Sequence, residues 1–139
     1  NAKILAACEN LAALPRAFIR FIHAGDGFYT QIDVASLKAH ILAAVVAGMR
    51  QQDIDRQPAK LLKLAGLILA DATRRIINSG VILSDADYCR GLGIAQSNWQ
   101  RSWSGKKEAG LDAMHKLSGK AMGQVVEGLE RLQTEKREA

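Results

Sequence analysis

Apolar side chains recur along most of this chain at intervals of three and four residues, the spacing that places them on one face of an α-helix. The pattern predicts helices over residues 3–14, 16–24, 34–51 and 58–78, and no alternation favours a strand. In the helix over 58–78 the apolar residues lie nearly all round the middle, as is typical of a central buried helix. Residues 1–80 are therefore expected to form an N-terminal helical body.

The last part of the chain carries a less regular pattern. A C-terminal helix is expected over 108–139, broken or loosened by Gly110 and Gly119. Four apolar residues in it follow an a/d spacing of three, four and three, namely Met122, Val125, Leu129 and Leu132. So short a seam is consistent with two arrangements: packing of this helix on its own domain, or pairing with a second copy of the chain in a homodimer.

Residues 81–107 contain the most distinctive local signals. Ser84 and Asp87 are placed as in a capping box at the start of a helix over 85–92. Gly93 follows, and it can adopt a positive φ because it has no Cβ to clash. A second helix is expected to begin soon after this turn. Helix, glycine turn and helix in this order predict a helix-turn-helix, whose second helix lies in the DNA major groove.

The second helix of the motif is expected to begin near Gln96 and to bury Trp99 and Trp103, which lie four residues apart. Its outward side chains can read bases, because arginine bridges guanine O6 and N7 and glutamine bridges adenine N6 and N7. Two lysines beyond Gly105, where this helix is expected to end, suit backbone phosphates. The predicted DNA-contacting residues are Gln96, Ser97, Asn98, Gln100, Arg101, Ser104, Lys106 and Lys107.

The charge distribution favours the same partner. The 139 residues carry a net charge of +5, and between residues 90 and 120 six basic residues oppose two acidic ones, so that 6 − 2 leaves +4 of that total. A local excess of positive charge is typical of proteins that bind polyanions. Double-stranded DNA is therefore the expected partner.

Other functions lack a matching set of residues. The three histidines, His23, His40 and His115, are scattered without metal-ligand spacing, and Cys8 and Cys89 lie far apart. No enzyme active site, metal or cofactor is expected. Charges interrupt every apolar stretch before it reaches membrane-spanning length, so the chain is expected to be cytoplasmic and without a membrane partner.

The predicted fold is an all-α helical bundle that carries the helix-turn-helix and ends in the C-terminal helix, in one compact domain. Its motif, LGIAQSNWQRSWSGKK, resembles that of the lambda Cro and repressor class in the glycine turn, the Gln-Ser opening and the basic end. Tryptophan at both inward positions departs from that class, which usually has smaller aliphatic residues there. This departure implies a wider pocket beneath the second helix.

The whole arrangement is similar to the bacteriophage antitermination protein Q class, on the segments LPRAFIRF and ILSDADYCRGLGIAQSNWQRSW. This resemblance implies a late-gene antiterminator that binds DNA at a late promoter and acts on a paused RNA polymerase in the bacterial host cell. Some members of the class carry a cysteine-rich zinc segment, which this sequence lacks. The function expected from the sequence is thus that of a sequence-specific, DNA-binding regulator of transcription.

Two alternatives remain open at this point. A dimeric repressor of the Cro type would use the same motif on a palindromic site with half-sites one helical turn apart. A helical protein–protein adaptor would keep the motif without binding DNA, since any amphipathic helix has a solvated polar face. The salt dependence of binding separates the adaptor from the DNA-binding proteins, and the symmetry of the recovered site separates the repressor from the antiterminator.

Overall fold

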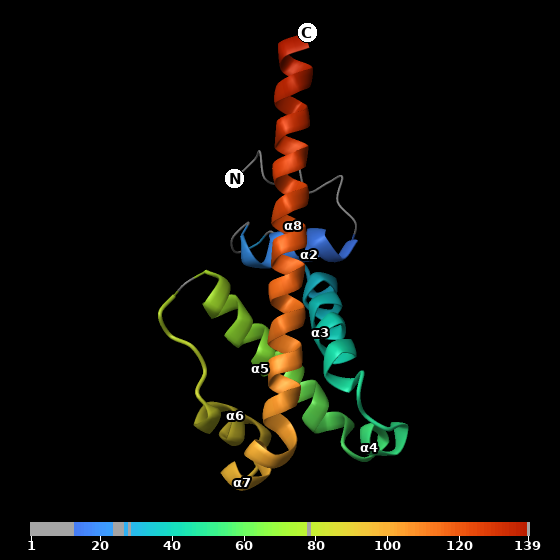
Figure 1. Cartoon of the computed structure of the whole chain (residues 1–139), viewed down its shortest axis with the longest axis vertical. Helices are drawn as coiled ribbons and strands as arrows, with labels where there is room; N and C mark the ends of the chain where they lie inside the picture. Colours follow the sequence, from blue (N-terminus) through green and yellow to red (C-terminus); the bar gives the residue numbers. More distant parts are fainter. Residues whose placement is uncertain (1–12, 24–26, 28, 78, 139) are drawn as a thin grey trace. The chain divides into compact units, whose positions relative to one another are not determined.

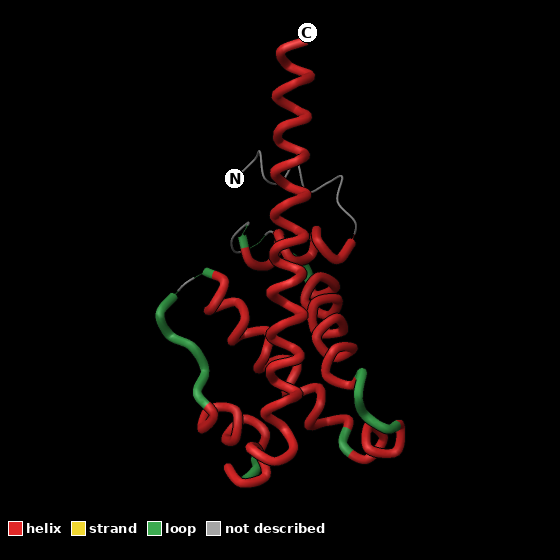
Figure 2. Tube along the Cα trace, in the orientation of Figure 1, coloured by secondary structure: helices red, strands yellow, loops and turns green. Residues whose placement is uncertain are grey.

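The computed structural model describes residues 13–23, 27, 29–77 and 79–138, and every regular element within these residues is a helix (Figures 1 and 2). The all-α fold with a long C-terminal helix is therefore confirmed. The helix predicted over 3–14 lies almost entirely outside the described residues. The elements in order are α2 (Ala13–Ile22), α3 (Gln31–Val46), α4 (Gln51–Arg56), α5 (Pro58–Ile76), α6 (Asp85–Leu92), α7 (Gln96–Asn98), the π-helical turn η1 (Trp99–Trp103) and α8 (Ser104–Glu138).

The prediction of one helix over 34–51 is wrong, because α3 ends at Val46 and α4 begins at Gln51. A turn separates them, closed by a hydrogen bond of 2.9 Å from the Met49 N–H to the Val46 carbonyl. Arg50 then adopts an extended conformation, with φ −74° and ψ 146°. The connection expected around Asp53 is consequently a short helix, which stops just before Pro58 because a proline disfavours helical geometry in the residue before it.

The glycines of the C-terminal region do not interrupt its helix, contrary to expectation. α8 runs without a break through Gly105, Gly110 and Gly119. A Cβ on Gly110 would lie 2.7 Å from Ile68 Cδ1 of α5 and 3.1 Å from Ile41 Cγ2 of α3, closer than side-chain atoms pack. This glycine is therefore required by the close approach of α8 to two other helices rather than by a turn.

Replacing Gly105 with alanine is expected to raise the free energy of unfolding by roughly 0.5–1 kcal/mol, because alanine loses less conformational entropy in a helix. A Cβ at this position would meet no atom within 4 Å, so no clash offsets the gain. Urea denaturation measures the difference. A loss of stability would indicate that the helix does end at Gly105, as the sequence alone suggested.

The chain divides into two compact units, one formed by Asn1–Leu37 with Lys116–Ala139 and the other by Lys38–His115. This division falls inside α3 and α8, and the boundaries expected at residues 80 and 107 stay predictions. In the first unit, Thr30 and Asp33 cap α3 reciprocally, with N–H to side-chain oxygen distances of 2.9 and 3.2 Å. α2 turns one face inward, with buried side chains at Ala17, Phe18 and Ile19.

The predicted a/d seam of the C-terminal helix is only partly buried. Val125 is 3% exposed, whereas Met122 is 38% exposed and Leu132 is 47% exposed. The buried side chains in this part of α8 are instead spaced by four residues, at Leu117, Ala121 and Val125. The helix therefore buries a different face from the one that the seam predicted.

The second unit is built around α5, as the sequence predicted for its central buried helix. α5 crosses α8 near Gly110 and packs against α6, where a Cβ on Gly91 would lie 2.8 Å from Leu67 Cδ1. His40 of α3 contributes to the same unit, with its Nε2 atom 3.3 Å from the Ala113 carbonyl of α8. The buried residues of α5 are Leu61, Leu64, Ala65, Ile68, Leu69, Asp71 and Ala72.

Candidate nucleic-acid interface

α6 begins with the capping box that the sequence predicted. The Ser84 hydroxyl accepts a hydrogen bond of 3.2 Å from the Asp87 N–H, and the Asp87 carboxylate accepts one of 2.8 Å from the Ser84 N–H. These bonds from Ser84 hold the pKa of Asp87 below its ordinary value of 3.8. The carboxylate therefore stabilises the helix start at and above that pH, and the contribution is lost as the pH falls through the lowered pKa.

The turn after α6 also has the predicted geometry. Gly93 adopts a left-handed conformation, with φ 68° and ψ 39°. Its N–H donates to the Arg90 carbonyl at 3.3 Å, and the Ile94 N–H donates to the Cys89 carbonyl at 3.1 Å. This pair of bonds is a Schellman motif, which pairs the last carbonyls of the helix and redirects the chain.

Replacing Gly93 with valine is expected to lower the free energy of unfolding by about 1–3 kcal/mol, since a β-branched residue is strained at positive φ. A Cβ would meet no atom within 4 Å there, so any loss reports on the backbone conformation alone. Gly93→Asn is the matched control, because asparagine tolerates this conformation better. Thermal unfolding that ranks valine with asparagine would contradict the assigned turn.

The helix after the turn is not a regular α-helix. It starts at Gln96 as predicted, passes through the π-helical turn η1, and continues directly into α8. Within η1 the Ser104 N–H bonds to the Trp99 carbonyl, five residues back. The segment 96–106 is called the reading segment below.

The spacing of inward side chains explains this π turn. Trp99, Trp103, Lys107 and Leu111 follow one another at intervals of four, and in an α-helix each step of four overshoots a full turn by about 40°. The wider π turn takes up the extra residue, so both tryptophans face inward. Trp99 is 0% exposed and Trp103 is 3% exposed, which confirms their predicted burial.

A layer of aromatic rings supports the reading segment from inside. Trp99 stacks on Tyr88 of α6, with ring centroids 4.9 Å apart and an interplanar angle of 23°. The Lys107 ammonium lies 5.6 Å from the Tyr88 centroid and 5.8 Å from the Trp99 centroid. It also lies 3.5 Å from an Asp85 carboxylate oxygen and 3.3 Å from one of Glu108. Such cation–π contacts stabilise a partly desolvated lysine.

Lys107 therefore differs from what the sequence suggested. Its side chain is only 13% exposed, and its charge is neutralised by two carboxylates. The ammonium is directed over the Tyr88 and Trp99 rings rather than toward the exposed polar face. Lys106 does not lie beyond a helix end either: its ammonium donates to the Ser102 carbonyl and lies 5.1 Å from the centroid of the Trp103 ring.

A buried carboxylate, which the sequence did not single out, fixes α6 on α5. Asp71 is 0% exposed and accepts hydrogen bonds from the Tyr88 hydroxyl at 2.5 Å and from the Leu83 N–H at 3.1 Å. Arg75, one helical turn further along α5, donates to the same carboxylate at 3.0 Å. Burial, together with the bond to Asp71, raises the pKa of Tyr88 above its ordinary range. The one sequence signal was an acidic residue within an apolar helical stretch.

The outward face of the reading segment is polar. Gln96, Ser97, Gln100 and Arg101 are exposed, while Asn98 and Ser104 are half-buried. Ser104 donates its hydroxyl to the Gln100 carbonyl at 3.2 Å. The first four residues thus share one side of the helix, opposite the buried tryptophans.

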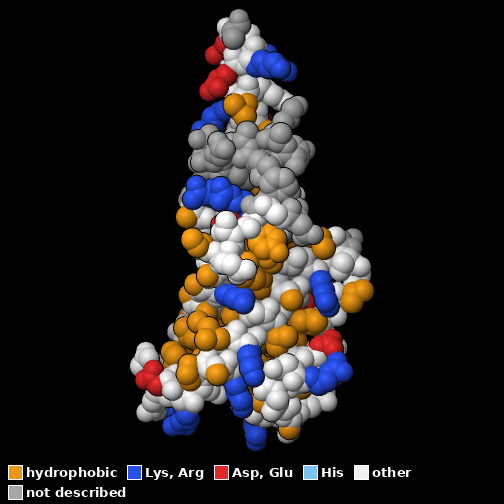
Figure 3. Space-filling model, turned by 180° about the vertical axis from the view of Figure 1, so that it is seen from behind, with side chains coloured by type: hydrophobic (Ala, Val, Ile, Leu, Met, Phe, Trp, Pro, Cys, Tyr) orange, Lys and Arg blue, Asp and Glu red, His pale blue; other side chains and the backbone are white. Residues whose placement is uncertain are grey.

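The charge around this face is positive. Figure 1 places α4, α6 and α7 at one end of the second unit, and Figure 3 shows Lys and Arg side chains gathered at that end among fewer acidic ones. The unit from Lys38 to His115 contains 11 basic and 7 acidic residues, so 11 − 7 gives +4. Within the described residues, Arg101 has no carboxylate within ion-pair distance, whereas Arg90 is paired with Asp87.

A hollow of about 560 Å³ lies beside the reading segment. Five polar or charged side chains of that segment line one part of it: Gln100, Arg101, Ser102, Ser104 and Lys106. The end of α3 and the turn after it line another part, with Ala44, Val45, Gly48 and Met49. Gly105 and Ala109 of α8 complete the lining.

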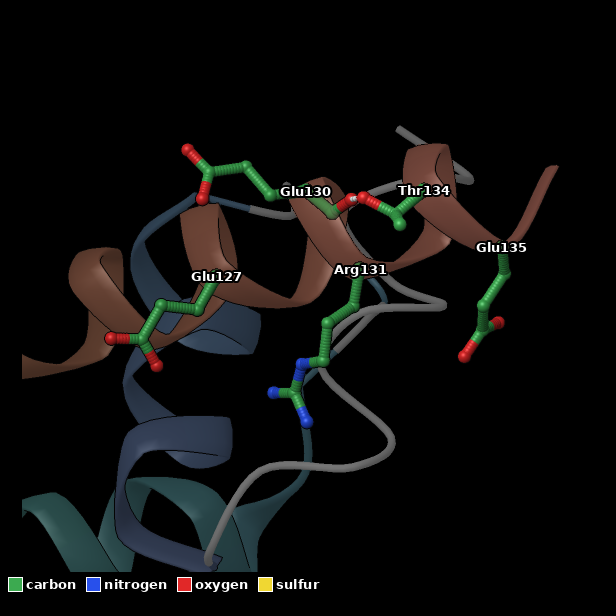
Figure 4. A pocket seen from close by; sticks show the side chains of 5 residues that line it. All are labelled: Glu127, Glu130, Arg131, Thr134 and Glu135. Carbon is green, nitrogen blue, oxygen red and sulfur yellow. Dashed lines mark hydrogen bonds between the residues drawn. The ribbon is translucent and has the colours of Figure 1, made fainter. Parts of the chain in front are cut away.

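A second hollow, of about 460 Å³, lies along the end of α8 (Figure 4). It is lined by Glu127, Glu130, Arg131, Thr134 and Glu135, and the Thr134 hydroxyl donates to the Glu130 carbonyl at 3.0 Å. The mixed charges of this open surface do not form a ligand set. No group of three or more metal-ligating side chains occurs in the described part of the chain.

Comparisons with protein-family models, with curated proteins and with solved structures found no match for this chain. Within the described residues, none of the helices has the length and apolar character needed to cross a bilayer. The functional interpretation therefore rests on the chemistry and geometry of the residues themselves.

Proposed function

We propose that this protein is a sequence-specific DNA-binding regulator of transcription, with the reading segment in the major groove of duplex DNA. The observation that carries the proposal is the pairing of two opposite faces on this helix. One face is anchored by Trp99 and Trp103 in the interior, and the other presents four exposed polar side chains behind a glycine turn. This combination supplies a rigid helix with base-reading groups.

Each exposed side chain has a suitable partner in the major groove. Arg101 can donate two hydrogen bonds to guanine, and Gln96 or Gln100 can bridge adenine. Ser97 can meet a base edge or a phosphate oxygen. The net charge of +4 on this unit favours association with a polyanion and makes the affinity dependent on salt.

Within this proposal, late-gene antitermination is the finer assignment, with RNA polymerase as the second partner. The similarity to the antitermination protein Q class supports it. A dimeric Cro-type repressor is the second candidate, because Met122 and Leu132 leave apolar surface on α8 that a second copy of the chain could cover. The symmetry of the bound site distinguishes the two, since a repressor dimer protects a palindrome.

The test begins with a binding selection from random duplexes, followed by titration of the recovered site at several salt concentrations. We expect a defined site and a steep loss of affinity as salt rises. Arg101→Ala is expected to relax preference at one base pair, at a cost of about 1–3 kcal/mol for that pair. Arg74→Ala, which removes an exposed arginine of α5 outside the reading segment, is the control for charge alone.

Two results would count against the proposal. If selection recovers no site and the protein binds no duplex at low salt, the polar face is only a solvated surface, as in an adaptor. If Arg101→Ala weakens binding to all duplexes equally, Arg101 does not read a base.

A further inference from the structure

The hollow beside the reading segment has two chemically different walls. The wall from the reading segment carries two cations, Arg101 and Lys106, together with the hydroxyls of Ser102 and Ser104. The wall from α3 is apolar, with Val45 and Met49 on either side of Gly48. No carboxylate is among the residues that line it. The hollow is thus suited to a ligand that combines negative charge with apolar surface.

The reading segment narrows the choice of ligand. Gln100 and Arg101 belong both to the base-reading face and to the lining of the hollow. A duplex whose base edges meet these two side chains must place a sugar–phosphate strand next to them. The hollow is the concave surface next to Gln100 and Arg101, and the end of α3 with the turn after it forms its other wall.

We propose that this hollow holds the sugar–phosphate backbone of one DNA strand, so that the end of α3 is a second DNA-contacting element. The inference rests on the proposed DNA binding. Phosphate oxygens accept hydrogen bonds from Arg101 and Lys106, while deoxyribose carbons contact the partly exposed side chains of Ala44 and Met49. Lys106 exchanges its bond to the Ser102 carbonyl for one to a phosphate. Contacts of this kind fix the register of a protein on DNA without reading sequence.

Gly48 offers a steric test that leaves every charge in place. A Cβ at Gly48 meets no atom within 4 Å and the residue does not have a positive φ, so larger side chains are compatible with the fold. Gly48→Phe adds a ring on the apolar wall, and Gly48→Ala is the matched small variant. Gly123→Phe adds the same ring to an exposed position of α8 outside the hollow, where a Cβ also meets nothing.

We expect Gly48→Phe to reduce affinity by about tenfold for both the selected duplex and a random duplex, because the lost contacts are to the backbone. Gly123→Phe should bind as the unaltered protein does, and Gly48→Ala should lose less affinity than Gly48→Phe because its side chain is smaller. Circular dichroism and thermal unfolding confirm that each variant is folded. If Gly48→Phe does not fold, Gly105→Phe fills the same hollow from its other wall, where a Cβ is also unobstructed.

A folded Gly48→Phe or Gly105→Phe protein with unchanged affinity would overturn this inference while leaving the proposed function intact. A loss confined to the selected duplex would also overturn it, since that result assigns base reading to the hollow. If the unaltered protein binds no duplex, the proposed function itself fails. Duplex binding by the unaltered protein therefore distinguishes failure of this inference from failure of the proposed function.

Discussion

Replacing Asp71 with alanine is expected to lower the free energy of unfolding by about 3 kcal/mol, because the buried Tyr88 hydroxyl and the partly buried Leu83 N–H lose their acceptor. The carboxylate is fully buried and accepts from the Tyr88 hydroxyl and the Leu83 N–H. Neither donor has another partner among the hydrogen bonds of the described residues. The loss of the bond to Arg75 costs less, because the Arg75 side chain is 30% exposed and can form a hydrogen bond to water instead.

Urea denaturation followed by circular dichroism measures this loss. Tyr88→Phe is the matched variant: it removes one donor and keeps the carboxylate and the ring, so it should cost about 1–2 kcal/mol. If Asp71→Ala is no more destabilising than Tyr88→Phe, the carboxylate does not hold the Leu83 backbone in place. DNA affinity should fall together with stability, because Asp71 fixes the helix before the reading segment.

Local chemistry made the turn and the caps of α6 predictable. Ser84, Asp87 and Gly93 act within a few residues of their own backbone, so their geometry follows from residue type and spacing. The inward position of Trp99 and Trp103 was also predictable, because helical spacing determines which residues share a face.

The other glycines could not be interpreted in the same way. Gly48 lies between α3 and α4, whereas Gly105 and Gly110 lie inside a continuous helix. The intrinsic cost of glycine in a helix is only about 1 kcal/mol, which is small enough for a helix to run through such a residue. For Gly110 the deciding contacts are Ile41 and Ile68, which are distant in sequence.

The sequence predicted which side chains of the candidate site are exposed, but it did not predict the contacts that support them. Lys106 and Lys107 are adjacent and chemically identical, yet Lys107 is directed inward over Tyr88 and Trp99. This difference depends on the π turn, which the four-residue spacing from Trp99 to Leu111 could have indicated. Asp71 could not have been found in this way, because its donors come from the loop before α6 and from α6 itself.

Replacing Trp99 with alanine is expected to lower the free energy of unfolding by about 3–5 kcal/mol, through the cavity left by the largest fully buried side chain of the reading segment. The variant loses the stack on Tyr88 and one of the two rings beneath the Lys107 ammonium. The helix that presents the exposed polar face is then no longer held against Tyr88 of α6 by this side chain. We therefore expect duplex binding to be abolished together with the stability of this segment, as measured by urea denaturation and titration.

Trp99→Phe separates the packing of this residue from its polar atom. The indole Nε1 of Trp99 is buried and has no hydrogen-bond partner in the described part of the chain. A phenyl ring is smaller and leaves a gap, but it also removes an unpaired N–H whose burial costs about 1–3 kcal/mol. The two effects oppose each other, so Trp99→Phe should be far milder than Trp99→Ala and should keep duplex affinity. If phenylalanine is as destabilising as alanine, the indole nitrogen has a partner in solution, and a buried water would be the first candidate.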